Sequence, residues 1–397
     1  MSNPGLSGPL AGLRVLDFSI MMAGPYASRY LADLGADVVK IEAPEGDYIR
    51  TREPLRDGCS AYFGHLNAGK RSLCLDLKDP DSLAAVLAMV PKVDVLVENF
   101  RPGTMARLGL DWPRLQALNP RLVYCSISGF GQTGPDAHRP AYAQIVQAAS
   151  GWELANAGYQ AQEGDEVRPA STATFVADVM GGLYAFSAIL AALQQRHATG
   201  RGQHIDSTLM EGMLNLLPYE MQEAQFPARQ RRHVYPPFRA SDGWLMIAAV
   251  SPRNFEALLD AIDVPGWRDE PTLATDRARQ QHWPAAMARI EAWTSQRTRA
   301  ECERVIGGAG VPITAYATVR EAQAGAQVAH RGSMAPVHDA AGVMRVPTLP
   351  FRFSDATVTV GPRVPGLGEH GAQVLAEWAG LSGDALAAVL ARGRLTG

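Results

Sequence analysis

The sequence contains one carboxylate whose position calls for a chemical explanation. Asp178 lies near the start of the run FVADVMGGLYAFSAILAAL, residues 175–193, which otherwise consists of apolar, small and hydroxyl-bearing residues. Such a run predicts a helix that is buried on all sides. Burying a carboxylate costs free energy unless the group is paired. A buried carboxylate therefore suggests a function, and Asp178 is the first candidate for a catalytic group.

The residues around Asp178 indicate how it can act. Thr172 and Thr174 are possible caps of the helix, and they place Asp178 in its first turn, where the helix dipole favours an ionised, nucleophilic carboxylate. Gly181 and Gly182 each cost about 1 kcal/mol relative to Ala within a helix, which is tolerated where backbone or a ligand approaches closely. A tightly packed helix with an N-terminal aspartate explains the same residues equally well, and both interpretations remain open at this point.

Basic residues gather at the ends of predicted strands. They are Lys70, Arg71, Lys78, Arg101 and Arg107, in the stretches NAGKRSLCLDLK and VENFRPGTMARLGL. The stretch NFRPG, followed by a helix, also offers backbone N–H groups that suit phosphate. Each of these residues alone is explained equally well as a solvated charge, but the group together favours an anionic ligand.

Other kinds of catalytic and metal site find no support in the sequence. The nine histidines are scattered, and neither a Ser or Cys nucleophile with a matching His nor an H-E-x-x-H pattern occurs. The four cysteines lie far apart without a C-x-x-C pair, which predicts neither a metal site nor a disulfide framework. Free cysteines fit a reducing cytoplasm.

Composition narrows the class of protein. The chain has 397 residues, of which 47% are hydrophobic and 19% charged, with a formal net charge of -3, which argues against a nucleic-acid-binding surface. The first 19 residues have neither a basic segment nor a long apolar one, so secretion is not expected. Residues 175–193 are long enough to span a bilayer, but the single run carries Asp178 and several small residues, which favours a core helix over membrane insertion.

The first 130 residues alternate between strand and helix patterns. Strands are expected in LRVLDFS, ADVVKIEAP, VDVLVENF and LVYCSISGFG, and helices in PYASRYLADLG, DSLAAVLAMVPK and GTMARLGLDWPRLQALNP. This order predicts an α/β fold with a mostly parallel sheet covered on both faces, and ligands at the carboxyl ends of its strands. A dinucleotide site is disfavoured because FSIMMAGP offers one glycine where G-x-G-x-x-G has three, although Glu42 stands where a ribose-binding acid would be.

The domain organisation follows from changes along the chain. Residues 1–205 are expected to form the first part of a large domain, and residues 206–228, rich in Pro, Arg and Gln towards their end, a linker. Residues 229–329 have strand and helix patterns of their own and predict a smaller α/β domain. Residues 330–397, with the strand-like VTVG and the helical HGAQVLAEWAGL, are expected to return to the large domain.

Taken in order, these stretches strongly resemble the class III CoA-transferase family, the group of formyl-CoA transferases, carnitine-type CoA transferases and α-methylacyl-CoA racemases. The resemblance extends over nearly the whole chain. The matching stretches are LAGLRVLDFSIMMAGPYASRYLADLGADVVKIEAPEGD, KRSLCLDLKDP, VDVLVENFRPGTMARLGL, LVYCSISGFGQTGP, VADVMGG, TGRGQHIDSTLMEGM, SDGWLMIAA and VPGLGEH.

The resemblance implies a fold, an activity and a set of site residues. The fold is a Rossmann-like large domain with a parallel sheet plus a smaller inserted α/β domain, in an interlocked homodimer. Asp178 corresponds to the family's nucleophile, which passes through an acyl anhydride and an aspartyl-CoA thioester. Coenzyme A and acyl-CoA are substrates, and no tightly bound cofactor or metal is expected. The residues that correspond to CoA contacts are Met22, Ala23, Leu75, Lys78, Asn99, Phe100, Arg101, Arg107 and Tyr142.

Departures from the family pattern bear on the substrate. Formyl-CoA transferases resemble one another in having Gln where this chain has Met22, and an acidic residue where it has Ala143. They also have a glycine-rich loop near the stretch RQRRHVYPP, which contains no glycine here. Formate and oxalate are therefore disfavoured. Arg229, Arg231 and Arg232 either face water or bind the distal carboxylate of a dicarboxylic acid, which a guanidinium matches well. We therefore expect succinyl-CoA as donor and a C4 or C5 dicarboxylate such as mesaconate, itaconate or citramalate as acceptor.

Three other functions remain to be distinguished. An α-methylacyl-CoA racemase needs a second acid or base, but the His-Asp pair of that branch is replaced by Tyr142 and Ala143. An NAD oxidoreductase needs the three glycines of a dinucleotide-binding turn, and this chain has one of them. A non-catalytic CoA-binding protein would keep the CoA contacts without using Asp178. The sequence thus predicts a cytoplasmic enzyme with acyl-CoA and carboxylic acid substrates, and with neither nucleic acid nor membrane as a partner.

Overall fold

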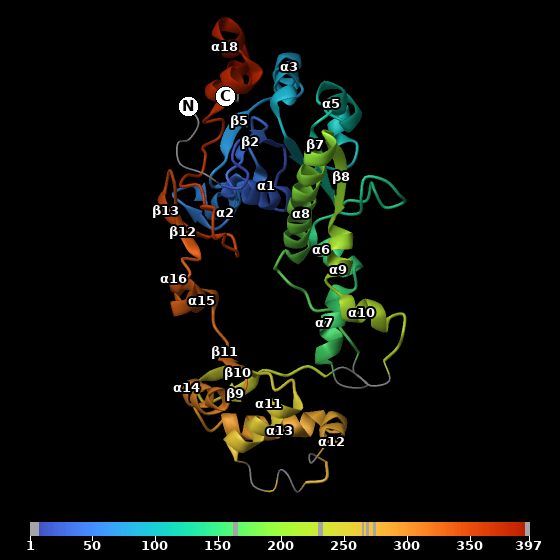
Figure 1. Ribbon diagram of the computed structural model, residues 1–397, viewed down its shortest axis with the longest axis vertical. Coiled ribbons are helices and arrows are strands. Elements are labelled where there is room, and N and C mark those ends of the chain that lie inside the picture. The colour runs from blue at the N-terminus through green and yellow to red at the C-terminus, as the bar shows by residue number, and fades with distance from the viewer. Residues whose placement is uncertain are drawn as a thin grey trace. The chain divides into compact units, whose positions relative to one another are not determined.

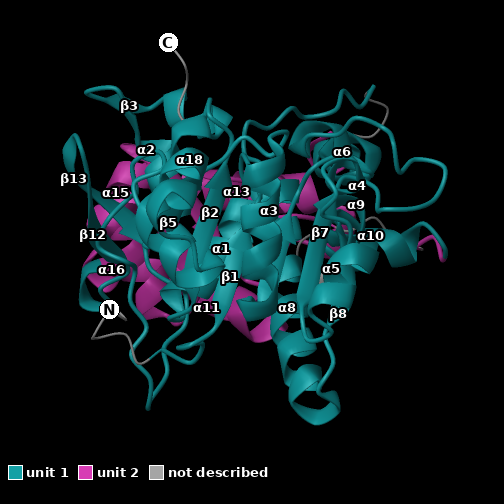
Figure 2. Ribbon diagram, turned by 90° about the horizontal axis from the view of Figure 1, so that it is seen from above, with its two compact units in different colours: residues 1–157, 166–225, 329–397 teal, residues 158–165, 226–328 magenta. Residues whose placement is uncertain are grey.

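A computed structural model describes residues 8–161, 166–228, 233–263, 266, 270–272 and 275–393. The chain divides into two compact units, which Figure 2 shows in different colours. Unit 1 contains residues 1–157, 166–225 and 329–397, and unit 2 contains residues 158–165 and 226–328. The described segments nearest the two ends of the chain, residues 8–157 and 329–393, therefore both belong to the larger unit, and most of the smaller unit is a single insertion.

Unit 1 is built on a six-stranded parallel sheet with the order β5-β2-β1-β6-β7-β8. The strands are β1 (Arg14–Asp17), β2 (Asp37–Glu42), β5 (Arg71–Cys74), β6 (Val95–Glu98), β7 (Val123–Ser128) and β8 (Gln203–Thr208). The predicted α/β fold class is confirmed. Because the strand order reverses between β1 and β6, a crevice for ligands is expected beyond the carboxyl ends of these two strands.

The central strands are apolar on both faces because both faces are covered. Every residue of β6 and β7 is buried, as expected for a parallel sheet between two layers of helices. Successive residues of β7 contact different cores: Val123, Cys125 and Ile127 pack in one, and Tyr124 packs in the other.

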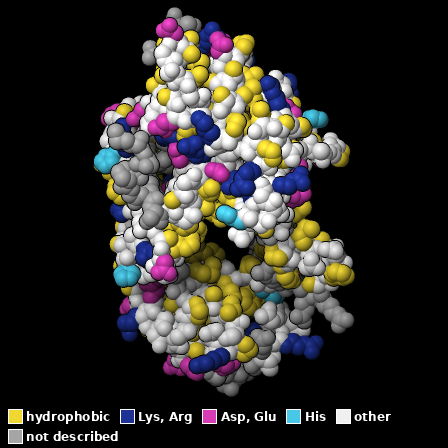
Figure 3. All heavy atoms as spheres, turned by 45° about the horizontal axis from the view of Figure 1, so that its top comes forward, with side chains coloured by type: hydrophobic (Ala, Val, Ile, Leu, Met, Phe, Trp, Pro, Cys, Tyr) yellow, Lys and Arg dark blue, Asp and Glu magenta, His cyan; other side chains and the backbone are white. Residues whose placement is uncertain are grey.

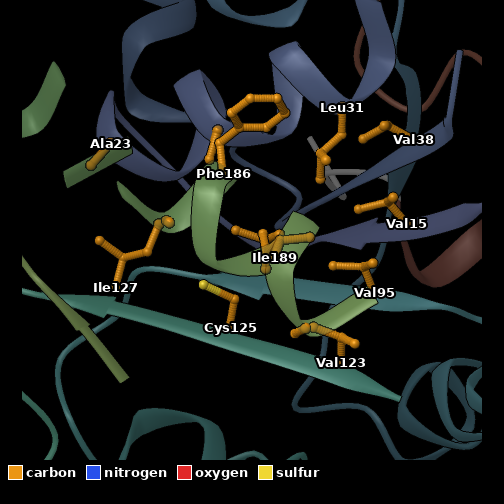
Figure 4. Close-up of a cluster of buried hydrophobic side chains, with 14 of the residues drawn as sticks. Val15, Ala23, Leu31, Val38, Val95, Val123, Cys125, Ile127, Phe186 and Ile189 are labelled. Carbon is orange, nitrogen blue, oxygen red and sulfur yellow. The ribbon is translucent and has the colours of Figure 1, made fainter. Parts of the chain in front are cut away.

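Helices form a layer on each face of this sheet. The first core holds α1 (Ala23–Asp33), α6 (Ala143–Ala149), α8 (Val176–Thr199) and α9 (Leu209–Asn215). Figure 4 shows Phe186 and Ile189 of α8 between the strands, with Val95 and Val123, and α1, with Leu31. The second core holds α3 (Pro80–Met89), α5 (Trp112–Leu118) and the C-terminal helices α17 (Gly371–Val374), η4 (Leu375–Ala379) and α18 (Gly383–Arg392).

Helix α8 is buried along one stripe and not on all sides as its composition predicts. Ala177, Gly181, Ala185 and Ile189 are buried at the expected helical spacing, whereas Tyr184 is 40% exposed. It is one helix among the described residues that is long and apolar enough to cross a membrane, although such a helix in the core of a folded protein passes the same test. One stripe of α8 thus packs in the first core, and the opposite stripe stays partly open.

The glycines of α8 permit close packing on two neighbouring helices. A Cβ at Gly182 would lie 2.7 Å from the carbonyl oxygen of Ala23, and one at Gly181 would lie 2.2 Å from Leu209. The pair is therefore explained by the approach of α1 and α9. Close packing of these glycines is compatible with both interpretations of Asp178.

The C-terminal segment returns to unit 1. The hairpin of β12 (Met334–Asp339) and β13 (Gly342–Pro347) packs against α2 (Ala61–Asn67), and Figure 1 shows α18 beside α3, from which it is distant in sequence. The expected strand in VTVG is absent, since residues 358–361, which the structure describes, are outside any strand. A single bridge between His338 and Arg363 stands beyond it.

Unit 2 has its own small sheet and core. Strands β9 (Phe238–Ala240), β10 (Gly243–Ile247) and β11 (Ile313–Ala315) form an antiparallel sheet that packs against α11 (Pro252–Ile262) and α13 (Trp283–Thr294). The segment 206–228 assigned to a linker contains the end of β8, α9 and α10 (Pro218–Glu223), and residues 206–225 lie within unit 1. The polar composition of this segment predicted a linker, but a short helix can be apolar on one face while its sequence is rich in polar residues.

The close approach of α8 and α1 can be tested with Gly182→Ala. The added Cβ meets a backbone oxygen, which cannot rotate away, so we expect a loss of stability of about 1–3 kcal/mol. Thermal unfolding measures this loss. Gly308→Ala is the matched control, because Gly308 has helical dihedral angles and nothing within 4 Å of its would-be Cβ. Equal melting temperatures for the two variants would contradict the packing.

Candidate functional site

The candidate site begins at the turn that joins β1 to α1. The side chain of Asn99, just after β6, accepts a hydrogen bond from Ile20 N (2.8 Å) and donates one to Ile20 O (2.8 Å). Phe18 N also donates to Val97 O at 2.8 Å. The turn after β1 and the loop after β6 are thereby joined at the switch point of the sheet, which brings together the predicted residues Met22 and Asn99.

Buried ions support this turn from below. Lys70 Nζ lies 2.9 Å from Asp17 Oδ2 with both side chains fully buried, and Ser19 and Ser28 also donate to Asp17. Burial alone would raise the pKa of Asp17, but Lys70, Lys40 and the two hydroxyls lower it to about 2. Asp17 is therefore ionised at neutral pH and anchors the start of the turn.

A second buried pair fixes the other half of the turn. Lys40 Nζ lies 2.9 Å from Asp47 Oδ2 and donates to Ser19 O at 2.6 Å. Asp47 Oδ1 accepts a hydrogen bond from Met21 N at 3.2 Å, and Met21 has the left-handed φ of 63°. Because non-glycine residues seldom adopt this conformation, the turn depends on its hydrogen bonds for its shape. Met22 follows directly as the N-cap of α1.

Asp178 lies beside this turn. Gly182, four residues further along α8, packs against Ala23 O and Tyr26, and residues four apart share one face of a helix. Asp178 is thus one turn, roughly 5.4 Å along α8, from Gly182, the residue that packs against the start of α1. Its side chain is partly buried, and burial raises its pKa to about 6. No ion pair or hydrogen bond to its carboxylate occurs among the described residues, so no neighbouring group there neutralises its charge.

Tyr62 is a neighbour of Asp178 that the sequence analysis did not find. Burial and then the negative charge of Asp178 raise the pKa of Tyr62 to about 12. The phenol belongs to α2, whose start is capped by Ser60, and packs near Met21 and Met22. A helix start is recognisable in this stretch, but nothing in the sequence relates Tyr62 to a carboxylate on α8.

The first turn of α8 differs from the prediction in its cap. Its N-cap is Phe175, which supplies no side-chain hydrogen bond, whereas Thr172 and Thr174 lie before the helix. The N–H of Ala177 donates to Gln147 Oε1 of α6 at 3.3 Å. An acceptor from another helix therefore occupies the place in which a threonine hydroxyl was expected. Gly181 and Gly182 lie deeper in the helix, where amides bond to carbonyls four residues earlier, so they are not free donors.

The other predicted CoA contacts lie at the carboxyl ends of the strands, with different exposure. Ala23 and Leu75 are buried, so that only their backbone can meet a ligand, and Met22, Asn99 and Phe100 are half-buried. The exposed members are Lys78, Arg101, Arg107 and Tyr142. Arg107 Nη2 donates to Thr104 Oγ1 at 2.8 Å, and Tyr142 precedes α6 as its N-cap.

Two of the basic residues grouped by the sequence analysis serve other purposes. Lys70 is fully buried with Asp17, and Arg71 pairs with Asp37 and Glu377 at the amino end of β5. They are thus at the opposite end of the strand from Lys78, which follows its carboxyl end. The sequence analysis grouped Lys70 and Arg71 with Lys78 because they are close in sequence, but the four residues of β5 separate the two edges of the sheet. Arg229, Arg231 and Arg232 lie outside the described residues.

A buried carboxylate supports the loop that carries Asn99 and Phe100. Glu98 Oε2 accepts a hydrogen bond from Phe100 N at 2.9 Å, and Ser126 also donates to Glu98. Burial raises the pKa of Glu98 to about 7 against these hydrogen bonds. Ser126 Oγ in turn lies 3.0 Å from His204 Nε2. The row of polar groups across β6, β7 and β8 holds the loop after β6 in place.

Comparison with known proteins identifies the family. The sequence profile of CoA-transferase family III matches residues 10–371. The chain belongs to CoA-transferase family III. An acetyl-CoA:oxalate CoA-transferase of Acetobacter aceti is 39% identical over 383 residues, covering 94% of this chain and 96% of that protein. A succinate–glutarate CoA-transferase of Agrobacterium fabrum is 34% identical, covering 94% and 96%.

A solved structure agrees with this assignment. A CAIB/BAIF family protein from Brucella suis has a TM-score of 0.83 and 34% identity, covering 94% of this chain and 100% of that chain. The protein is thus a family III CoA-transferase with a mixed α/β fold, and it uses CoA thioesters as substrates. The resemblance on which the sequence analysis depends is confirmed at the level of the family.

The surface of this CoA-transferase is mixed in charge. On the face that Figure 3 shows, the basic side chains of the described residues lie interspersed with acidic ones, as the net charge of -3 leads one to expect. Among the same described residues, no group of three or more His, Cys, Asp or Glu is arranged to hold a metal ion.

The buried charge of Asp178 predicts a pH-dependent effect of Asp178→Asn on stability. The folded pKa, about 6, lies above the ordinary value of 3.8, so the folded state binds the proton more tightly than the unfolded one. The stability that tighter proton binding gives to the folded state is fully present below pH 4 and is lost as the pH rises through 6. We therefore expect the neutral variant to be more stable than the parent at pH 8, by about 1–2 kcal/mol after allowance for partial exposure, and equal to it at pH 4.

Chemical denaturation at the two pH values measures this difference. Asp136→Asn serves as the control, because Asp136 is an exposed aspartate whose ion pair with Arg139 is long, at 3.8 Å. A variant of Asp178 that is destabilised at pH 8 would show that its carboxylate has a compensating partner.

Proposed function

We propose that the protein transfers CoA from an acyl-CoA, succinyl-CoA foremost, to a C4 or C5 dicarboxylic acid such as mesaconate, itaconate or citramalate, with Asp178 as nucleophile. The observation that carries the proposal is Asp178 itself. It is a partly buried carboxylate without a neutralising partner among the described residues, at the start of α8 and beside the β1–α1 turn. Such a group is more reactive than a solvated one because burial disfavours its charge.

The reaction proceeds through four acyl exchanges: one at the donor carbonyl, two at the carbonyl of Asp178 and one at the acceptor carbonyl. The Asp178 carboxylate attacks the donor thioester, and the C–S bond breaks to give a mixed anhydride and CoA thiolate. The thiolate attacks the aspartyl carbonyl and releases the donor acid, leaving an aspartyl-CoA thioester. The acceptor carboxylate then attacks this thioester and releases CoA thiolate. Attack of the thiolate on the acceptor carbonyl of the new anhydride yields the product acyl-CoA and regenerates Asp178.

The proposed chemistry suits the surroundings of Asp178. Acyl anhydrides hydrolyse readily, so the intermediates require a site that excludes water. Tyr62, Met21 and Met22 each pack against the same hydrophobic cluster of unit 1. The phenol of Tyr62 stays protonated at neutral pH and is a donor for a developing oxyanion. A racemase would need a second acid or base beside Asp178, and this chain has Tyr142 and Ala143 where the racemase branch has its His-Asp pair.

The acceptor class rests on the relatives and on this chain's departures from them. One relative is named for oxalate and another for glutarate, and both acids are dicarboxylates. Met22 stands at the start of α1, where formyl-CoA transferases resemble one another in having Gln, and this departure is our reason for preferring an acceptor with a longer carbon chain than oxalate. We further propose that the active form is a homodimer, as the family resemblance implies, and exposed apolar residues such as Ile145 and Leu154 on α6 and α7 (Trp152–Gln160) fit such an assembly.

The substrate proposal is tested with a panel of carboxylic acids. The protein is incubated with succinyl-CoA and, separately, oxalate, glutarate, mesaconate, itaconate, citramalate and acetate, and the acyl-CoA products are identified by mass spectrometry. We expect the C4 and C5 dicarboxylates to give the highest kcat/KM. Preference for oxalate or acetate would contradict the acceptor proposal and leave the CoA-transferase activity intact.

The role of Asp178 is tested with Asp178→Ala. Loss of the nucleophile is expected to lower the transfer rate by at least about 10³-fold, while CoA binding, measured by calorimetry, changes little. Mass spectrometry of the parent protein mixed with succinyl-CoA is expected to detect a covalent adduct on the peptide that contains Asp178. Asp136→Ala is the matched surface control and keeps full activity. Full activity of Asp178→Ala would refute the mechanism.

A further inference from the structure

Gln147 is a buried polar residue that the proposed mechanism does not use. It belongs to the face of α6 that packs on the first core, and the other members of this face, Ala143 and Val146, are apolar and buried. The exposed fraction of Gln147 is 0%. Its Nε2 atom is buried and has no hydrogen-bond partner among the described residues. An amide in such a place needs a reason, because an unsatisfied buried donor is costly.

The side chain of Gln147 makes one hydrogen bond to another helix among the described residues, and its partner lies in the turn that carries Asp178. Gln147 Oε1 accepts from Ala177 N at 3.3 Å, and Ala177 directly precedes Asp178 in α8. The first four N–H groups of a helix lack partners within the helix and are normally satisfied by a polar N-cap side chain. Phe175, the N-cap of α8, has no polar side chain and supplies no such bond. Gln147 therefore supplies a cap that α8 itself lacks.

Helix ends fray when their terminal groups are left unsatisfied. The described contacts of the first turn of α8 include Val176 N to Thr174 O (2.9 Å) and Val179 N to Phe175 O (3.1 Å), which are local. The bond from Ala177 to Gln147 joins this turn to a separate helix that is packed into the core. Fixing Ala177 also fixes the backbone of the next residue, and a misplacement of about 1 Å at a reacting group can lower a rate by about 10²-fold.

We propose that Gln147 is a positioning residue, which caps the first turn of α8 from α6 and so holds the Asp178 carboxylate in its reactive position. The inference rests on the proposed role of Asp178 as nucleophile. It assigns Gln147 no contact with substrate. Its loss should lower the rate of the covalent steps while leaving the affinity for acyl-CoA unchanged.

Two substitutions separate the cap from simple packing. Gln147→Met keeps a long unbranched side chain but removes the acceptor, and Gln147→Glu keeps an acceptor at the same position while removing the Nε2 donor. Gln144→Met is the matched control, since Gln144 lies on the same helix and is exposed. All three variants are assayed beside the parent protein at pH 8, because the carboxyl group introduced by Gln147→Glu is more fully ionised there than at neutral pH.

We expect Gln147→Met to lower kcat by about tenfold or more with KM for acyl-CoA within twofold of the parent. Gln147→Glu should recover most of this loss, and Gln144→Met should behave as the parent. A parental kcat in Gln147→Met would overturn the inference, and so would a Gln147→Glu variant that is as slow as Gln147→Met.

A second measurement covers the case in which Gln147→Met does not fold. Hydrogen exchange of the parent protein, read by mass spectrometry on peptides spanning residues 174–180, is expected to show a protected Ala177 amide. Exchange at the rate of an unprotected amide would overturn the inference. The outcome for Asp178→Ala is independent: activity in that variant refutes the nucleophile, whereas an unaffected Gln147→Met refutes only the cap.

Discussion

Two buried ion pairs form the constraint on which the candidate site depends. Asp17 with Lys70 and Asp47 with Lys40 lie under the turn between β1 and α1, and each pair also binds the backbone or a hydroxyl of that turn. Removing one partner of a buried pair leaves an uncompensated charge, which is strongly destabilising. The two pairs therefore hold the turn in its shape, with Met21 in a left-handed conformation, and the predicted ligand contacts of the turn are placed relative to it.

The position of Asp178 follows from this turn through helix packing. Gly182 lets α8 approach Ala23 O at the start of α1, and Gly181 lets α9 approach from another side. The glycines thus contribute to the site by lowering the distance between helices and not by donating hydrogen bonds. Asn99 completes the arrangement, because its amide binds both polar groups of Ile20 and joins the loop after β6 to the turn after β1.

The sequence predicted the elements better than it predicted their contacts. The alternation of apolar strands and helices indicated a parallel sheet, and the family motifs indicated which loops follow its strands, because these signals are local in the chain. Lys70 and Arg71 were grouped with Lys78 and Arg101 on the same local basis, although they are used at the other edge or beneath the turn. Thr172 and Thr174 were sensible caps by type, but Phe175 occupies the N-cap and Gln147 provides the acceptor.

The sequence by itself determined the alternation of strands and helices in the first 130 residues, the family and the carboxylate expected to react, since periodicity and motif spacing are properties of the chain alone. Tertiary structure decided which charges are buried as pairs, which side of α8 stays open, and which residues surround Asp178. Tyr62, Gln147 and Glu98 acquire their importance only from neighbours far along the chain. Burial and electrostatic interaction depend on distances in space, and a single sequence does not contain these distances until the sheet and its helices have come together.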